Sequence, residues 1–229
     1  MRTTLFRDDP SCRSVVRGAA VFGAAFLVTA CSSTPKVPGP NVPGPLESVA
    51  HYGENLYDAA RTKDWAAAAA QLDTLKHATT ELSGMADGSA ALKSGVSVQL
   101  AVLDTSVSNH NRMTTLRSAN EVTRLAAELS RPYHPPVPVE ITLLDYSGRE
   151  LEVWAEAGDL AKLREATATL RQTWDHVRKT VEKQRGGVAA AAGFDALVSR
   201  AESAATIGDY AAAATPILDE VDKLERLFP

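Results

Sequence analysis

Cysteine is almost absent from this sequence. Cys12 and Cys31 are the only two in 229 residues, and both lie near the start of the chain. The remainder therefore has no disulfide, no thiolate nucleophile and no sulfur ligand for a metal. Its stability must come from an apolar core alone.

Strongly basic segments and membrane-spanning apolar segments are also missing. The net charge is −4, and about −6 without the first thirty residues, and Lys and Arg form no cluster. This charge argues against a nucleic-acid partner and against lying flat on anionic lipid. The apolar run from Gly18 to Ala30 has thirteen residues, whereas a membrane-spanning helix needs roughly 20.

Linear motifs of catalysis and cofactor attachment are lacking too. The sequence has no Gly-x-Ser-x-Gly, no His-Glu-x-x-His and no phosphate-binding glycine loop. It also has no Cys-x-x-Cys-His, which excludes covalently attached haem. We therefore expect a protein that is not an enzyme and that holds no cofactor.

The first thirty residues have the three-part layout of a secretory signal peptide: a start containing four arginines, the apolar run, and small residues before a cysteine. The segment Val28-Thr29-Ala30-Cys31 resembles the lipobox of bacterial lipoprotein precursors. In that family an aliphatic residue and two small residues precede the cysteine that becomes the mature N-terminus.

This resemblance implies cleavage before Cys31, diacylglycerol on its thiol and a further acyl chain, such as palmitate, on the new amine. Two or three acyl chains hold a protein stably, since each buried CH₂ contributes about 0.8 kcal/mol. Ser32, in place of Asp, favours the outer over the inner membrane. We expect a lipid-anchored protein on the periplasmic face of the cell envelope.

The chain is expected to have three parts. Residues 1–30 are the signal peptide, residues 31–45 are the lipidated cysteine and a tether rich in Pro and Gly, and residues 46–229 are a helical domain. Five prolines between positions 35 and 45 exclude a helix there. At about 3.1 Å per residue, such an extended tether reaches on the order of 40 Å.

From Leu46 onward, apolar residues recur at helical spacing, and no segment alternates with a period of two. The pattern predicts an all-α fold, an antiparallel bundle of about six or seven helices built from helical hairpins. The longest periodic segment, 89–130, would run about 60 Å as one helix. Its polar cluster at 108–111 is a candidate kink.

Three joints between expected helices share similar sequences, with aspartates at positions 64, 159 and 209 that are suited to begin a helix. The joints lie 95 and 50 residues apart. This unequal spacing does not support a solenoid. We expect three similar hairpins within one bundle.

Four histidines, one methionine and two acids are candidates for metal or haem binding. His110 and Met113 fall on the apolar face of segment 89–130, where a bundle can hold haem or a metal, and His134 lies in a proline-rich crossover. We favour a hydrogen-bonded core histidine beside a core methionine. Asp73, His77 and Glu81 share one helix face, which we expect to face solvent, and His176 has no partner in the sequence pattern.

A ladder of charges follows one face of segment 139–157, formed by Asp145, Arg149, Glu152 and Glu156. The default interpretation is exposed ion pairs worth a few tenths of a kcal/mol each. The alternative is a polar network that fixes the register between helices, with Asn120 and Glu121 as partners.

Together these patterns predict a lipid-anchored envelope protein whose helical bundle is a binding or scaffolding module. Its expected contacts are the membrane, through lipid on Cys31, and an envelope protein. The alternative is a periplasmic carrier of metal or haem that uses His110, Met113 and His134. A hydrolase of envelope polymer ranks third.

Overall fold

The computed structural model describes residues 42–86 and 88–228. The predicted signal peptide, the lipidation site Cys31 and most of the tether lie outside these residues, so they stay predictions. Within the described ranges, no helix is both long enough and apolar enough to cross a bilayer.

The described residues form eight α-helices and one 3-10 helix, without any strand. The helices are α1 (Gly44–Arg61), α2 (Trp65–Gly84), α3 (Ala90–Ser108), α4 (Arg112–Ser130), α5 (Val139–Ala157), α6 (Leu160–Glu182), α7 (Gly187–Glu202) and α8 (Ile207–Glu225), with η1 (Arg131–Tyr133) after α4. The prediction of an all-α bundle is confirmed. The count exceeds six or seven because segment 89–130 contains two helices.

The expected long helix is wrong because the chain reverses at residues 109–111. His110 adopts a left-handed backbone conformation with φ of 53°, which ends α3. The side chain of Asn111 then accepts a hydrogen bond from the backbone N–H of Thr114 and caps α4. Across the turn, the Thr115 hydroxyl donates to Ser106 Oγ at 3.0 Å. The polar cluster is therefore a hairpin turn, not a kink.

Aspartate caps begin two other helices where the sequence predicts them. Asp64 and Asp159 accept hydrogen bonds from the backbone N–H groups of Ala67 and Lys162. The last helix differs, because Thr206 is its N-cap and Asp209 closes a capping box by accepting from the Thr206 N–H at 2.9 Å. Helix α8 thus begins before Asp209.

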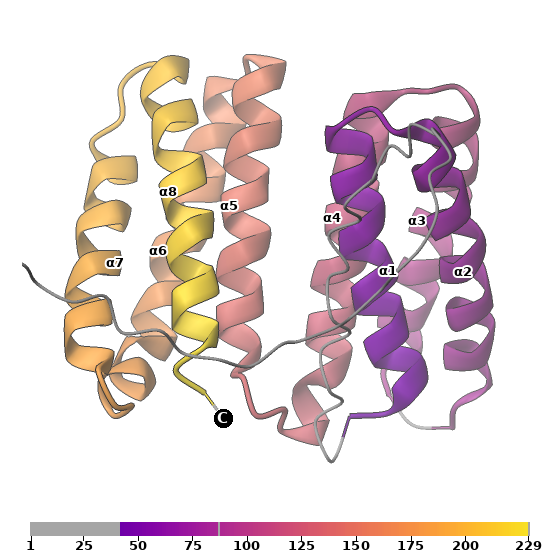
Figure 1. Ribbon diagram of the computed structural model, residues 1–229, viewed down its shortest axis with the longest axis horizontal. Coiled ribbons are helices and arrows are strands. Elements are labelled where there is room, and N and C mark those ends of the chain that lie inside the picture. Colours follow the sequence, from indigo (N-terminus) through magenta and orange to yellow (C-terminus); the bar gives the residue numbers. More distant parts are fainter. Residues whose placement is uncertain (1–41, 87, 229) are drawn as a thin grey trace, which may run out of the picture. The chain divides into compact units, whose positions relative to one another are not determined.

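The eight helices pack as two groups of four, each around its own core (Figure 1). In the first bundle, α1 to α4, each helix packs against the next and α4 returns to α1. The second bundle, α5 to α8, repeats this order. Helices α4 and α5 pack against each other and join the two bundles.

Buried positions recur in the two bundles at a constant interval of 95 residues. The matched pairs are Leu46–Ile141, Val49–Leu144, Leu56–Leu151, Leu75–Leu170, Val96–Ala191, Leu103–Val198, Ala119–Ala214, Val122–Ile217 and Leu129–Leu224. The caps Asp64 and Asp159 match at the same interval, as do Asn111 and Thr206. The chain therefore contains an internal repeat of one four-helix unit. The joint near Asp209 corresponds to the α3–α4 turn.

One matched pair consists of glycines at helix crossings. A Cβ on Gly53 of α1 would lie 3.2 Å from side-chain atoms of both Val122 and Thr123 on α4. A Cβ on Gly148 of α5 would lie 2.6 Å from Leu218 on α8. Both glycines therefore allow the first and last helices of a bundle to approach closely.

Candidate functional site

The three predicted metal-ligand candidates do not converge. His110 is exposed in the α3–α4 turn and stacks on Trp65, with ring centroids 4.9 Å apart and planes 11° apart. Met113 is half-buried against the first core. His134 is exposed beyond the other end of α4, a helix of 19 residues that spans about 28 Å at 1.5 Å per residue. The expectation that His110 lies on an apolar helix face is wrong.

Among the residues that the structure describes, no group of three or more His, Cys, Asp or Glu side chains is arranged to hold a metal. Asp73, His77 and Glu81 are exposed on α2, as expected. Lys76 lies beside them and forms ion pairs with Asp73 at 3.6 Å and with Asp104 of α3 at 2.5 Å. His176 is also exposed, on α6.

Three of the four ladder residues on α5 are half-buried, whereas Glu156 is 48% exposed and forms an ion pair with Arg112 of α4. The side chains of Arg149 and Asp145 are only 13% and 16% exposed, and Arg149 Nη2 lies 3.0 Å from Asp145 Oδ2. The Arg149 guanidinium also lies over the ring of Tyr57 on α1, 4.9 Å from its centroid. The Tyr57 hydroxyl donates to Glu152 Oε2 at 3.1 Å. For Asp145, Arg149 and Glu152 the surface interpretation is wrong, because they form a network with Tyr57 of α1. The expected partners of that network, on segment 89–130, are not part of it.

Burial sets the protonation of this network. It raises the pKa of Asp145 to about 6, although the Arg149 charge opposes the shift. Negative charges on Glu225 and Asp222 of α8 and on Asp58 of α1 add to the rise. Burial, followed by the Glu152 carboxylate, raises the pKa of Tyr57. The Tyr57 phenol therefore remains a protonated donor at neutral pH.

A second network joins α4 to another face of α5. Asn120 is fully buried, and its Nδ2 donates to the Tyr146 carbonyl at 3.1 Å and to Glu150 Oε1 at 2.9 Å. The other Glu150 oxygen accepts from Trp154 Nε1 at 2.7 Å. Arg117 of α4 lies over the Trp154 ring, 4.6 Å from its centroid. The predicted partner Asn120 thus bonds to Glu150 and not to the ladder.

Two buried polar atoms at this junction have no hydrogen-bond partner among the described residues. They are Asn120 Oδ1 and Arg149 Nη1. Such atoms cost free energy when buried without a partner. The two atoms belong to the networks that join α5 to α4 and to α1, so neither network satisfies all of its hydrogen-bonding groups.

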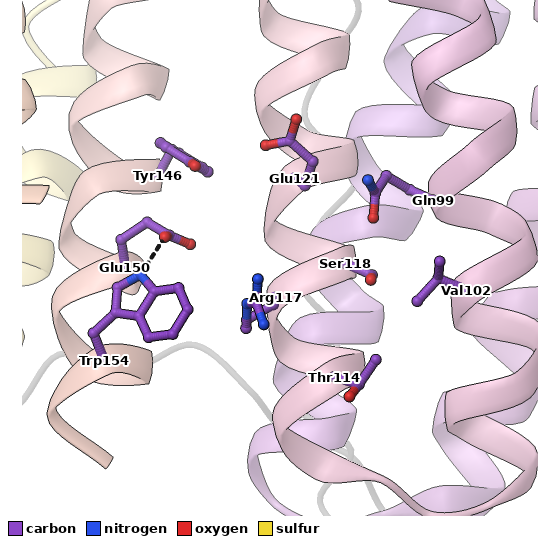
Figure 2. A pocket seen from close by; sticks show the side chains of 9 residues that line it. All are labelled: Gln99, Val102, Thr114, Arg117, Ser118, Glu121, Tyr146, Glu150 and Trp154. Atoms are coloured by element: carbon purple, nitrogen blue, oxygen red, sulfur yellow. Dashed lines mark hydrogen bonds between the residues drawn. The ribbon is translucent and has the colours of Figure 1, made fainter. Parts of the chain in front are cut away.

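The second network borders a hollow between α3, α4 and α5, with a volume of about 380 Å³ (Figure 2). We name it the junction groove; its lining residues are Gln99, Val102, Thr114, Arg117, Ser118, Glu121, Tyr146, Glu150 and Trp154. Tyr146, Glu150 and Trp154 project from α5, and Arg117 stands opposite them on α4 (Figure 2). A further hollow of about 240 Å³ between α4, α5 and α6 shares these four residues.

Sequence reasoning did not predict this groove, and the expected pairing of Glu121 with the α5 ladder is wrong, because both Glu121 oxygens accept from Arg124 of the same helix. Glu121 was expected as a polar partner on segment 89–130, whereas Tyr146, Glu150 and Trp154 were not recognised. Their spacing of four residues is a signal, because it places all three on one helix face. The same spacing also occurs on helix faces that are exposed to solvent. Only the packing of α4 against α5 shows that these three residues line a groove.

Comparison with known proteins adds no relative. No protein-family model, no curated protein and no solved structure matches the chain. Its function must be argued from its own residues.

Proposed function

We propose that this protein is a lipid-anchored component of a bacterial cell envelope, held by acyl chains on Cys31, whose helical part is a binding module. The junction groove is its binding site. The tether that follows Cys31 and ends where α1 begins at Gly44 gives the module reach, and the anchor raises its concentration at the membrane surface.

The junction groove is the observation that carries this proposal. Elsewhere the two bundles are held by apolar cores, whereas here charged, amide, hydroxyl and aromatic side chains from three helices meet around one hollow. A concave site with a few converging polar groups is the usual form of a small-ligand site. The volume of about 380 Å³ falls in the range of such sites.

The lipobox-like segment supports the anchor, and the acidic net charge of −4 supports a partner other than nucleic acid. A carrier of metal or haem receives no support from the positions of His110, Met113 and His134. These side chains are distributed over both ends of α4 and do not surround a shared space.

The anchor is tested by expressing the full chain in a bacterium fed a palmitate analogue, beside a Cys31→Ala variant. We expect label and membrane fractionation for the parent chain and neither for the variant. A labelled variant, or an unlabelled parent chain, would contradict the lipid anchor.

The binding module is tested on the same purified material by native mass spectrometry with elemental analysis. We expect a bound mass that the Trp154→Ala variant loses and the exposed-site variant Arg164→Ala keeps. Near-stoichiometric metal or haem would favour the carrier. A bound mass retained by Trp154→Ala would place the site elsewhere.

A further inference from the structure

The junction groove holds one cation that no carboxylate neutralises directly. Glu121 is engaged by Arg124, whose Nε and Nη2 donate to its two oxygens at 2.8 and 2.6 Å. Among the described residues no carboxylate forms an ion pair with Arg117, whose exposed side chain lies over the Trp154 ring. The guanidinium N–H donors of Arg117 therefore remain available to a ligand.

Trp154 keeps Arg117 apart from the nearest carboxylate of α5. The indole N–H donates to Glu150 at the edge of the ring, while the Arg117 guanidinium lies over the face of the ring. Each contact is favourable and specific in direction, since a ring face attracts cations and the indole N–H is only a donor. The two opposite charges thus contact the same indole ring, one at its edge and one on its face.

Glu150 is rigid yet keeps capacity for a further donor. Its oxygens accept one hydrogen bond each, from Asn120 and from Trp154, and a carboxylate accepts about four. Asn120 itself is fixed by full burial and by its bond to the Tyr146 carbonyl. A ligand ammonium therefore meets a preorganised acceptor.

We propose that the junction groove binds a zwitterionic α-amino acid with an apolar side chain. The ligand carboxylate accepts the paired N–H groups of Arg117, an arrangement that favours planar carboxylates. The ligand ammonium donates to Glu150, and the apolar side chain of the ligand rests against Tyr146, which lies on the same side of α4 as Glu150 (Figure 2). An α-amino acid carries its two charged groups on one carbon, which suits a pair of opposite charges that contact one indole ring. This inference rests on the proposed binding function and names its ligand class.

The test is isothermal titration of the full chain in detergent with L-leucine and L-phenylalanine. N-acetyl-L-leucine lacks the ammonium and L-leucinamide lacks the carboxylate, so these are the matched ligand controls. We expect saturable binding of at least one free amino acid and at least tenfold weaker binding of both derivatives.

Variants assign the two charges. Arg117→Gln is expected to weaken binding of the free amino acid at least tenfold while leaving the affinity for the amide unchanged. Glu150→Gln should weaken binding of the free amino acid and leave that of the N-acetyl derivative unchanged. Arg164→Gln, an exposed arginine on α6 outside the groove, is the control. An unchanged thermal midpoint shows that each variant is folded.

Three results would overturn the inference: no heat from either free amino acid, equal affinity for the derivatives, or equal loss in the Arg164→Gln control. The proposed function fails separately. If native mass spectrometry shows a bound mass that depends on Trp154 but titration shows no amino-acid binding, the groove is a binding site for another ligand class. If neither is seen, both proposals fail.

Discussion

At the scale of single residues, the junction between the bundles depends on a buried cation. Arg149 contacts the Asp145 carboxylate and the Tyr57 ring at the same time, and so connects α5 to α1. Breaking a buried ion pair by removing one partner is more damaging than losing a surface pair, because the remaining charge stays desolvated. Arg149 and Asp145 are therefore the residues where substitution reports most directly on the junction.

Arg149→Ala is expected to destabilise the protein by about 3 kcal/mol, which corresponds to roughly 6–12 °C in thermal midpoint for a chain of this size. Thermal unfolding followed by circular dichroism measures the shift. Arg164→Ala, an exposed arginine on α6, serves as control and should shift the midpoint by under 2 °C or so. Equal shifts in the two variants would mean that Arg149 behaves as a surface residue.

Asp145 should make stability depend on pH. Its folded-state pKa of about 6 lies above the ordinary value of 3.8, so its contribution is fully present below about pH 4 and is lost as pH rises through 6. The loss is of order 3 kcal/mol. Urea unfolding at pH 4 and pH 8 should show that Asp145→Asn removes this part of the pH dependence.

Other carboxylates make stability rise with pH instead of fall. Ion pairs and hydrogen bonds lower the pKa of Asp195 and Glu202. The informative quantity is therefore the difference between Asp145→Asn and the parent chain at each pH. The control is Asp73→Asn, at an exposed carboxylate. Its free energy of unfolding should differ from that of the parent chain by a nearly constant amount at every pH. A parallel pH profile for Asp145→Asn would show that the Asp145 carboxyl titrates normally.

At the scale of helices, the cost of replacing a glycine at a helix crossing depends on the side chain that it faces on the neighbouring helix. Gly53 meets Val122 and Thr123, whose β-branched side chains have little rotamer freedom. Gly148 meets the end of the half-buried Leu218 side chain, which is not β-branched, and lies at ordinary contact distance from Ile217. The same substitution should therefore cost more in the first bundle than in the second.

Gly53→Ala is expected to lower the free energy of unfolding by about 1–2 kcal/mol, since the strain of overpacking outweighs the better helix propensity of alanine. Gly84→Ala is the control, because a Cβ at the end of α2 meets nothing within 4 Å. Chemical denaturation of both variants measures the difference. A stabilised Gly53→Ala variant would show that α1 and α4 have room to separate.

At the scale of the whole described chain, two apolar cores are joined through a junction rich in charged and polar side chains. Val153 of α5 is the member of the second bundle that belongs to the first core. The rest of the α4–α5 contact includes Asn120, Glu150 and Arg117. Polar interfaces of this kind couple neighbouring units weakly.

Leu103→Ala is expected to lower the free energy of unfolding of the first bundle by about 2–5 kcal/mol, because it leaves a cavity at a fully buried position. Hydrogen exchange followed by mass spectrometry should show faster exchange in α1–α4 and little change in α6–α8. Phe194→Ala, in the second core, should give the reverse pattern. Uniform loss of protection in both variants would mean that the junction makes one cooperative unit of the two bundles.

Much of the secondary structure follows from the sequence alone, because helical periodicity and caps act over a few residues. Features of this class are the apolar stripes, the caps at Asp64 and Asp159, and the absence of strands from residues 42–86 and 88–228. The turn at His110 escaped recognition because the apolar period continues through it. Whether such a segment is one helix or a hairpin depends on the partners that cover its stripe.

The 95-residue repeat is also contained in the sequence, since every matched pair has the same spacing. It becomes evident once the buried positions are known, because five of the nine buried pairs consist of different residues. Two features were decided only by the tertiary structure. One is the burial of Asp145 and Arg149, and the other is the convergence of Arg117 with Glu150 and Trp154. They arise because α1 and α4 cover faces of α5 that are charged, and contacts between helices far apart in the chain leave no periodic pattern.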